Sequence, residues 1–319
     1  MSMERIPVLC IGAIGQSGST LLARMLGQVP GLVAVGETGR VWDKGLVEDM
    51  ACGCGEPFRA CPFWTAVGEE AFGGWDRVDT AEATRLRDGL TLRGRAPHAL
   101  ALPLILRPSL SRRYGADLRR YQALMGRLYV GIHRASGGRV IVDSMKQPAH
   151  VYMVSRMPEV DLRVVHLVRD SRGVAYSKTK WVHRQGARSD EFRVRRPPPK
   201  SGEKWIWMNL SFDALAGLGV PTSRLRYEEL VRSPKGALLR VLSELGIERR
   251  VDDLGFIGEG WVELPTDHLA AGSRMRLEAG RLPLREDDAW RHRLSPTHRR
   301  VVTALTWPLL VRYGYRGSP

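Results

Sequence analysis

Residues 6–22 read IPVLCIGAIGQSGSTLL, and this stretch decides the fold class. An apolar run typical of a buried strand ends in a turn rich in glycine and serine, and a helical pattern follows from Thr20. The first N–H groups of a helix lack intrahelical partners and the helix dipole is positive there, which favours an anion. Gly15 and Gly18 let a ligand approach the backbone closely. The stretch therefore predicts a phosphate-binding loop at the start of an α/β domain.

The loop departs from the G-x-x-x-x-G-K-[ST] pattern of nucleoside triphosphatases. When the last glycine of that pattern is aligned on Gly18, Ser19 stands where the lysine belongs and Ala13 where the first glycine belongs. The side chain that would reach the β- and γ-phosphates is therefore missing. This favours a ligand with a single 5′-linked phosphate group, and a nucleotide or small-molecule kinase is the alternative prediction.

The rest of the chain alternates short apolar runs with helical patterns, which predicts a three-layer α/β fold around a parallel sheet. The expected strands are 6–12, 32–36, 139–143, 162–168 and 224–227. The expected helices are 20–28, 116–135, 148–157, 172–183, 203–218 and 235–245. We expect a single domain over residues 1–319. Within it, 45–135 has a helical pattern and little strand signal, and is expected to form a helical insertion that acts as a lid on the acceptor side.

A second motif, VVHLVRDSRGVAYS at residues 164–177, again joins a buried strand to a helix. Arg169 follows the strand directly, and Ser177 lies on the helix. Ligands of parallel sheets bind beyond the carboxyl ends of the strands, so an arginine and a serine there predict a second phosphate site. The alternative is a structural ion pair between Arg169 and Asp170.

Together the two motifs resemble the cofactor sites of the sulfotransferases that use 3′-phosphoadenylyl sulfate (PAPS). In that family a serine-rich loop binds the 5′-phosphosulfate, and an arginine with a serine eight residues later binds the 3′-phosphate. The resemblance implies a P-loop-like fold, PAPS as donor, adenosine 3′,5′-bisphosphate as product and no metal requirement. The acceptor would be a hydroxyl group of a small molecule, a carbohydrate or a lipid-linked compound. The implied donor ligands are Gln16, Ser17, Gly18, Ser19, Thr20, Leu21, Arg169 and Ser177.

Gln16 is the clearest departure from that family, which usually has an arginine or lysine there to neutralise the transferring sulfonate. Either Gln16 donates a neutral hydrogen bond, or another cation such as Lys146 takes this role. Lys146 lies in DSMKQP, residues 143–148, which resembles a D-S-x-K-x-P segment of the family. It would stabilise charge on the leaving oxygen. Asp143 of the same segment would be a metal-binding acid in the kinase alternative.

The segment VGETGR around Glu37 resembles a G-E-x-x-R stretch that supplies a glutamate base in some members of the family. Sulfonate transfer needs a base that takes the proton of the acceptor hydroxyl, so Glu37 is the expected catalytic base. The alternative is a surface ion pair between Glu37 and Arg40. The backup bases are His150 and His183, whereas His166 lies inside a strand pattern and is expected to be structural.

A late segment, GSRMR at residues 272–276, resembles the glycine and basic loop that closes over the 3′-phosphate in the family. This makes Arg274 and Arg276 further candidate donor ligands.

The chain has 319 residues and a formal net charge of +15, and all but seven of its 49 cationic residues are arginine. Arginine binds phosphate and sulfate with two parallel hydrogen bonds, which favours an anionic ligand, although a solvated basic surface is the alternative. The arginines are spread along the chain and aromatic residues make up only 7%, so we expect no nucleic-acid partner. A non-catalytic nucleotide-binding or nucleic-acid-binding protein remains the second alternative.

The densest basic cluster, Arg184–Lys204, predicts a basic loop next to three prolines. Its Arg193, Arg195 and Arg196 would attract an acidic acceptor.

Three of the four cysteines form a C-x-C-x₆-C pattern at Cys52, Cys54 and Cys61, and Cys10 is expected to be buried in the first strand. The three are free structural thiols, or one of the first two forms a disulfide with Cys61, or they bind zinc, for which no fourth ligand is evident.

No apolar run approaches the ~18–20 residues of a membrane span, and the first residues lack the features of a signal peptide. We therefore expect a cytoplasmic protein with reduced thiols.

Overall fold

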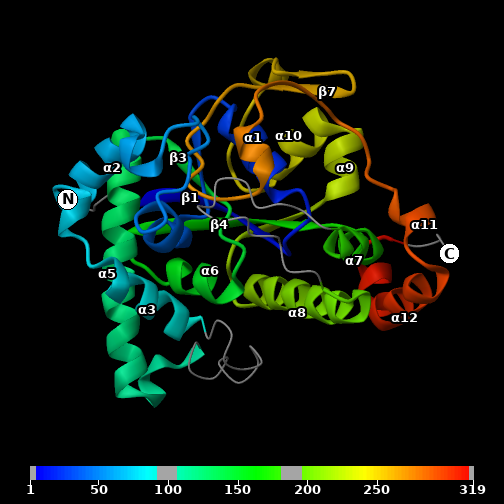
Figure 1. Cartoon of the computed structure of the whole chain (residues 1–319), viewed down its shortest axis with the longest axis horizontal. Coiled ribbons are helices and arrows are strands. Elements are labelled where there is room, and N and C mark those ends of the chain that lie inside the picture. Colours follow the sequence, from blue (N-terminus) through cyan, green and yellow to red (C-terminus); the bar gives the residue numbers. More distant parts are fainter. Residues whose placement is uncertain (1–4, 92–105, 181–195, 316–319) are drawn as a thin grey trace.

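The computed structural model describes residues 5–91, 106–180 and 196–315. Its centre is a five-stranded sheet in the order β2-β3-β1-β4-β5, and all paired strands run parallel (Figure 1). The strands are β1 (Ile6–Ala13), β2 (Leu32–Gly36), β3 (Val140–Asp143), β4 (Val160–Val168) and β5 (Thr222–Arg226). All five lie where the sequence predicts strands, so the central parallel sheet is confirmed.

Helices cover both faces of this sheet and complete three layers. They are α1 (Ser19–Gly27), α2 (Pro62–Phe72), α3 (Thr80–Leu90), α5 (Arg112–Ala135), α6 (Pro148–Ser155), α7 (Ser171–Thr179), α8 (Pro198–Gly217), α9 (Tyr227–Arg232), α10 (Pro234–Glu244), α11 (Trp290–Arg293) and α12 (Pro296–Arg312). Helices α1, α9 and α10 lie on one side of the sheet, and α6 and α8 on the other (Figure 1). Within the described residues, no helix combines the length and apolarity needed to cross a lipid bilayer.

Alternating side chains of β1 explain why both faces are covered. Val8 and Cys10 belong to a hydrophobic core shared with α5, α6 and α8, whereas Leu9 and Ile11 belong to a second core shared with α1 and α10. Successive residues of a strand point to opposite faces, so a strand covered on both faces is apolar at nearly every position. The burial of β1 on both faces of the sheet explains the continuous apolar run at the start of the chain.

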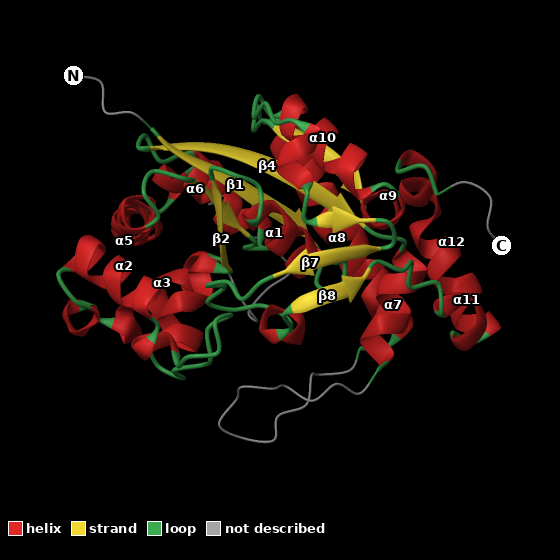
Figure 2. Ribbon diagram, turned by 90° about the horizontal axis from the view of Figure 1, so that it is seen from above, coloured by secondary structure: helices red, strands yellow, loops and turns green. Residues whose placement is uncertain are grey.

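The described residues between β2 and β3 contain helices α2, α3 and α5 and no strand of the central sheet. Helices α2, α3 and α5 pack on one another to one side of the sheet (Figure 2). Residues of α2 and α5 share one hydrophobic core with β1, which fixes the insertion against the sheet. Residues 92–105 of this stretch lie outside the described residues.

A small antiparallel sheet after α10 was not predicted. Its strands are β6 (Ile257–Gly258), β7 (Trp261–Leu264) and β8 (Gly280–Pro283), in the order β6-β7-β8. Strands of two to four residues are too short to show a period of two, so the sequence carries little signal for them. Val262 and Leu264 pack into the same core as α1, and the small sheet therefore lies beside that helix (Figure 2).

The predicted basic loop Arg184–Lys204 is wrong at its carboxyl end, because α8 begins at Pro198. Proline is well suited to the first turn of a helix, since it lacks an N–H that would have no partner there and its φ is already helical. The run of three prolines therefore starts a helix. Arg196 is exposed and donates its backbone N–H to the Lys178 oxygen at 3.2 Å. Arg193 and Arg195 lie outside the described residues.

Candidate functional site

Backbone conformation shapes the glycine–serine loop, residues 14–20, which joins β1 to the first turn of α1. Gln16 and Gly18 have positive φ angles of 80° and 85°. A residue with a side chain rarely adopts this conformation, and such strain clusters at functional sites. A β-carbon at Gly18 would lie 2.6 Å from the Tyr227 ring, so only glycine fits at this position without a shift.

The start of α1 presents polar groups suited to an anion. Among the described residues no side chain caps this helix, so its first N–H groups are available to a ligand. The Ser17 hydroxyl is fully buried and lacks a hydrogen-bond partner in the part of the chain that the structure describes. A bound ligand would satisfy this otherwise costly atom. Ser19, Thr20 and Leu21 follow in the first turn, and the Thr20 hydroxyl accepts from the Ser273 N–H at 3.3 Å.

Arg169 brings the two predicted phosphate sites into contact. It follows β4, is 6% exposed, and donates from Nη1 to the backbone oxygen of Gln16 at 2.9 Å. The Ser177 hydroxyl on α7 donates to Oε1 of Gln16 at 3.3 Å. Two segments that lie 153 residues apart in sequence therefore meet at one glutamine.

Further contacts hold the Arg169 guanidinium. Its Nη2 lies 3.0 Å from Oδ2 of Asp287, and its central carbon lies 4.6 Å from the centroid of the Tyr227 ring. Burial opposes ionisation of Asp287, but the hydrogen bond and charge of Arg169, together with the charge of Lys180, lower the pKa of the carboxyl. Asp170, the predicted alternative partner of Arg169, pairs with Arg172 at 2.7 Å. Arg169 thus has a partner that the sequence did not indicate.

Glu37 and Lys146 form an ion pair at the carboxyl ends of neighbouring strands. Glu37 directly follows β2, Lys146 lies three residues after β3, and Nζ of Lys146 is 2.5 Å from Oε1 of Glu37. Their side chains are 22% and 19% exposed, so both reach solvent at the edge of the sheet where ligands bind. Arg40, the predicted alternative partner of Glu37, lies 3.0 Å from Asp43. The candidate base and the candidate cation are therefore in direct contact.

Asp143, the last residue of β3, fixes the turn that carries Glu37. Its Oδ2 accepts from the Thr38 hydroxyl at 2.5 Å and from the Tyr129 hydroxyl at 2.7 Å. Its Oδ1 accepts from the Met145 N–H at 2.8 Å. Burial raises the pKa of this carboxyl, and the hydrogen bonds offset part of the increase. Because both oxygens are engaged inside the protein, Asp143 is a poor metal ligand, which counts against the kinase alternative.

Among the described residues, the histidines are poorer candidates for the general base than Glu37. His150 on α6 is 1% exposed, and burial lowers its pKa to about 3. His166 lies inside β4, as expected of a structural residue, with Nε2 2.9 Å from Oδ1 of Asn209. His183 lies outside the described residues.

The chain between β7 and β8 contains an anchored segment, residues 265–278, which Arg24 of α1 holds in place. Arg24 is fully buried although it belongs to no recognisable motif. Its guanidinium bonds, at 2.5–2.7 Å, the Asp267 carboxylate and the backbone oxygens of Pro265, Met275 and Glu278. One arginine therefore connects the helix after the glycine–serine loop with a segment more than 240 residues later.

The two late arginines of the predicted donor site differ in position. Arg276 is 2% exposed, and its Nη2 donates to the backbone oxygen of Ala51 at 3.1 Å. Burial lowers the pKa of Arg276, and the nearby Glu37 carboxylate opposes this shift. Arg274 is exposed. Arg276 thus links the anchored segment to the start of the insertion, and Arg274 remains accessible.

Two charged residues near the glycine–serine loop were missed in the sequence. The Nζ of Lys178 lies 3.4 Å from the place that a β-carbon on Gly15 would occupy. Lys178 directly follows Ser177, so a search for cations beside the predicted ligands would have found it. Asp287 lies 118 residues after its partner Arg169 in a stretch without a motif, and no sequence signal pointed to it.

The four cysteines are free thiols. Cys10 is buried in β1, as expected. Cys52, Cys54 and Cys61 gather with His268 of the anchored segment, and their ligand atoms all lie within 4.8 Å of one another. The histidine was missed because more than 200 residues separate it from the cysteines and nothing around it resembles a metal motif.

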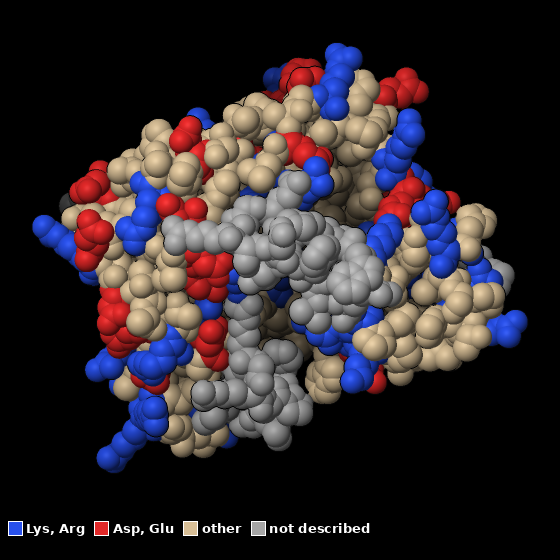
Figure 3. All heavy atoms as spheres, in the orientation of Figure 1, with Lys and Arg blue, Asp and Glu red and all other residues tan. Residues whose placement is uncertain are grey.

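Charge of both signs covers the described part of the face seen in Figure 3. Lys and Arg side chains are scattered over several elements, with Asp and Glu between them. The arginine surplus therefore does not form a single basic stripe on the part of this face that the structure describes.

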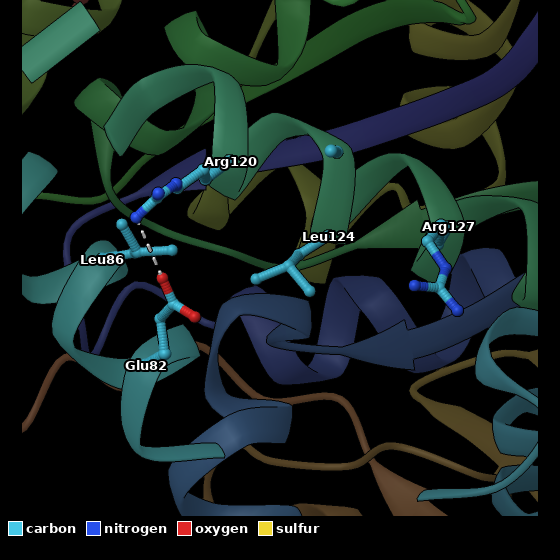
Figure 4. A pocket seen from close by; sticks show the side chains of 6 residues that line it. Glu82, Leu86, Arg120, Leu124 and Arg127 are labelled. Atoms are coloured by element: carbon cyan, nitrogen blue, oxygen red, sulfur yellow. Dashed lines mark hydrogen bonds and ion pairs between the residues drawn. The ribbon is translucent and has the colours of Figure 1, made fainter. Parts of the chain in front are cut away.

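A hollow of about 450 Å³ lies between α3 and α5 (Figure 4). It is lined by Glu82, Leu86, Arg120, Ala123, Leu124 and Arg127. Nη1 of Arg120 lies 3.5 Å from Oε1 of Glu82. None of the predicted site residues lines this hollow.

Comparison with known proteins identifies both a family and a fold. Residues 7–253 match the model of a family described as the sulfotransferase family. No curated protein sequence matches the chain.

Two solved structures resemble it over nearly their whole length. The sulfotransferase domain of the olefin synthase of Synechococcus PCC 7002 is 18% identical, with a TM-score of 0.53 over 100% of this chain and 98% of that domain. The sulfotransferase domain from the curacin biosynthetic pathway is 15% identical, with a TM-score of 0.50 over 94% and 98%. At such identities the likeness concerns the fold alone, and the predicted P-loop-like α/β fold is confirmed.

Proposed function

The chain belongs to the sulfotransferase family, and on this premise we propose that it transfers a sulfonate group from PAPS to a hydroxyl group of a second substrate. The contact between Arg169 and Gln16 carries this proposal, because it joins a loop suited to one phosphate group with an arginine suited to another. PAPS has phosphate groups at both the 5′ and the 3′ positions of its ribose. A nucleoside triphosphate lacks the 3′-phosphate that Arg169 would bind.

The glycine–serine loop would hold the 5′-phosphosulfate. The N–H groups at the start of α1 and the unpartnered Ser17 hydroxyl support this assignment, with Ser19, Thr20 and Leu21 completing the cradle. Arg169 and Ser177 would hold the 3′-phosphate, because a guanidinium binds phosphate bidentately. Arg274 lies on an exposed part of the anchored segment and would approach the donor there, whereas the buried Arg276 would position this segment.

The cation that Gln16 fails to supply would come from neighbouring residues. The amide of Gln16 already accepts a hydrogen bond from Ser177, which suits a positioning role. Lys178 lies beside Gly15, and Lys146 lies at the end of the adjoining strand β3. A positive charge near the transferring group stabilises the charge that develops on the bridging oxygen. We therefore assign the electrostatic role to Lys146 and Lys178 together.

Glu37 would act as the general base. In the reaction the acceptor oxygen attacks sulfur and its proton passes to the Glu37 carboxylate. The bond between sulfur and the bridging oxygen breaks, and adenosine 3′,5′-bisphosphate leaves with that electron pair. The ion pair with Lys146 holds the Glu37 carboxylate at the strand ends, where the acceptor hydroxyl would meet it. None of these reaction steps requires a metal ion.

The acceptor would bind between the strand ends and the helical insertion of residues 45–135, which would serve as a lid. A hydroxyl of a small molecule, a carbohydrate or a lipid-linked compound fits the family chemistry. We place the protein in the cytoplasm, a compartment in which cysteines stay reduced.

Calorimetric titration with adenosine 3′,5′-bisphosphate, run beside magnesium–ATP, tests the donor. We expect the bisphosphate to bind, and Arg169→Ala to weaken it by about 100-fold through the loss of two charge-assisted hydrogen bonds. Arg281→Ala is the matched control, because Arg281 is exposed and pairs with Glu263 on the small sheet. Binding of magnesium–ATP alone would replace the proposal with a kinase. Binding of neither ligand would refute a nucleotide donor.

A further inference from the structure

Three thiols and one imidazole converge where the insertion meets the anchored segment. The Sγ atoms of Cys54 and Cys61 lie 3.7 Å apart, and Nδ1 of His268 lies 3.4 Å from Cys61 Sγ and 4.0 Å from Cys52 Sγ. All four ligand atoms lie within 4.8 Å of one another. Cys52 and Cys61 are buried, and Cys54 and His268 are half-buried.

The separations of 3.4 and 3.7 Å are close to the edges of a metal-centred tetrahedron, and the separation of 4.0 Å is slightly longer. With metal–sulfur bonds of about 2.3 Å and metal–nitrogen bonds of about 2.0–2.1 Å, tetrahedral ligand atoms are about 3.5–3.8 Å apart. A disulfide would require the two sulfurs to approach to about 2.05 Å, far closer than the 3.7 Å between Cys54 and Cys61. The four side chains are therefore arranged around a common point and not as a bonded pair.

The local backbone folds the three cysteines toward this point. The chain turns at Gly55, which has a φ of 96°, and the Cys52 N–H bonds the Glu56 oxygen at 2.8 Å. Cys61 stands directly before α2, whose positive end favours a thiolate.

The histidine is held in an orientation that suits a ligand. Its ring stacks on Phe63, with centroids 5.0 Å apart and planes 14° apart. Its backbone oxygen accepts from Nε1 of Trp64 at 2.8 Å. The Leu269 oxygen accepts from the Gly53 N–H at 3.1 Å. Partners of this kind fix a metal ligand before the ion binds.

Charge balance also fits a thiolate site. A divalent ion with three thiolates and a neutral imidazole carries one negative charge, which is costly inside a protein unless it is paired. The buried Arg276 supplies a positive charge beside the site, because its Nη2 donates to the backbone oxygen of Ala51, the residue directly before Cys52, at 3.1 Å.

We propose that Cys52, Cys54, Cys61 and His268 bind one structural Zn²⁺ ion that ties the insertion to the anchored segment. Thiolate and imidazole ligands in tetrahedral geometry select zinc, and four protein ligands leave no open position for catalysis. The ion would join two stretches of chain more than 200 residues apart in sequence. This inference does not depend on the proposed sulfonate transfer.

Elemental analysis of the untagged full chain, after dialysis against a weak chelator, tests the site. We expect about one zinc per chain in the wild-type protein, as a closed four-ligand site requires. His268→Ala should lower zinc affinity by at least about 100-fold, the upper end of the loss seen for outer-shell partners. Absence of zinc from the wild-type protein, its replacement by iron, or a disulfide among these cysteines would overturn the proposal.

Two further variants separate loss of zinc from loss of folding. Cys10→Ala removes a buried thiol far from the cluster in sequence and should keep one zinc. His268→Cys restores a fourth soft ligand and should regain zinc, and its cobalt form should show the absorption of a tetrahedral thiolate complex. If His268→Ala kept its zinc, or if Cys10→Ala lost it, the assignment of these four ligands would be wrong.

Discussion

The glycine–serine loop and the anchored segment touch each other, yet they are held in different ways. The loop takes its shape from neighbours in sequence: a strand end, two residues with positive φ and a helix start. The anchored segment depends on Arg24, on His268 with its cysteine partners, and on the bond from Ser273 to Thr20. One wall of the site is thus formed locally, and the other is positioned by distant parts of the chain.

The two regions therefore have different roles. One supplies groups that bind a ligand, and the other positions those groups. The loop and Arg169 supply groups that bind an anion directly. Arg24 and Arg276 are buried and bond mainly backbone oxygens, so their effect on a ligand passes through the placement of the segment. Substitutions in the two regions should therefore affect different measurements.

The largest expected effect is on the anchored segment. Arg24→Ala removes a buried cation and leaves Asp267 without its partner, which should lower the free energy of unfolding by about 3–5 kcal/mol. Urea denaturation followed by circular dichroism measures this change. Arg281→Ala, in an exposed ion pair, should change stability by less than about 1 kcal/mol. Equal losses in the two variants would show that Arg24 does not anchor the segment.

The next effect concerns catalysis beside the loop. Glu37→Gln should reduce sulfonate transfer about 100-fold, because the amide cannot take the acceptor proton. The affinity for adenosine 3′,5′-bisphosphate should change far less than the rate, since Glu37 is assigned to the acceptor proton and its ion pair is with Lys146. Product release from PAPS with a panel of hydroxyl acceptors measures the rate, and calorimetry measures the affinity. Loss of affinity with an unchanged rate would assign Glu37 a structural role.

A smaller effect is expected within the loop itself. Gly18→Ala forces a β-carbon to 2.6 Å from the Tyr227 ring and should destabilise the protein by about 1–3 kcal/mol. Gly89→Ala in α3 meets no atom within 4 Å and should stabilise the protein by about 0.5–1 kcal/mol through its higher helix propensity. Thermal unfolding of both variants measures the difference. A Gly18→Ala protein as stable as the wild type would remove the steric argument.

The smallest effect is expected at Asp287, which lies outside both regions and competes with the ligand for Arg169. Asp287 holds the Arg169 guanidinium that we assign to the 3′-phosphate. Asp287→Ala should raise the affinity for adenosine 3′,5′-bisphosphate by about fivefold, since a partly exposed ion pair contributes up to about 1 kcal/mol. Calorimetry measures this change. A fall in affinity would mean that Asp287 orients Arg169 for the ligand.

The central sheet and the turns that follow its strands could be predicted from the sequence. The positions of the five parallel strands follow from apolar runs and the turns after them, and Arg169 and Ser177 stand out because each lies at a fixed place after a strand. Both residues contact Gln16, so the two motifs lie side by side, and their role as one donor site remains our proposal.

The anchored segment and the small sheet beside it could not be predicted from the sequence. Arg24 is one arginine among many, and its burial becomes visible only when residues 265–278 pack on α1. The short strands of the small sheet show no periodicity, and His268 lacks a motif. Contacts between residues more than 200 positions apart depend on tertiary packing, which local patterns do not encode.

The burial of Arg24 also has a consequence for the order of events during synthesis. Strand β1 pairs with β3 and β4, which follow it by more than 130 residues, and Arg24 finds its last partner only at Glu278. A nascent chain that has emerged only as far as the insertion can form helices but neither the central sheet nor the partners of Arg24. Such a chain exposes apolar surface and is prone to aggregate, as expected for a topology rich in long-range pairing. The contacts of Arg24 with residues 265–278 therefore form only after that segment has left the ribosome.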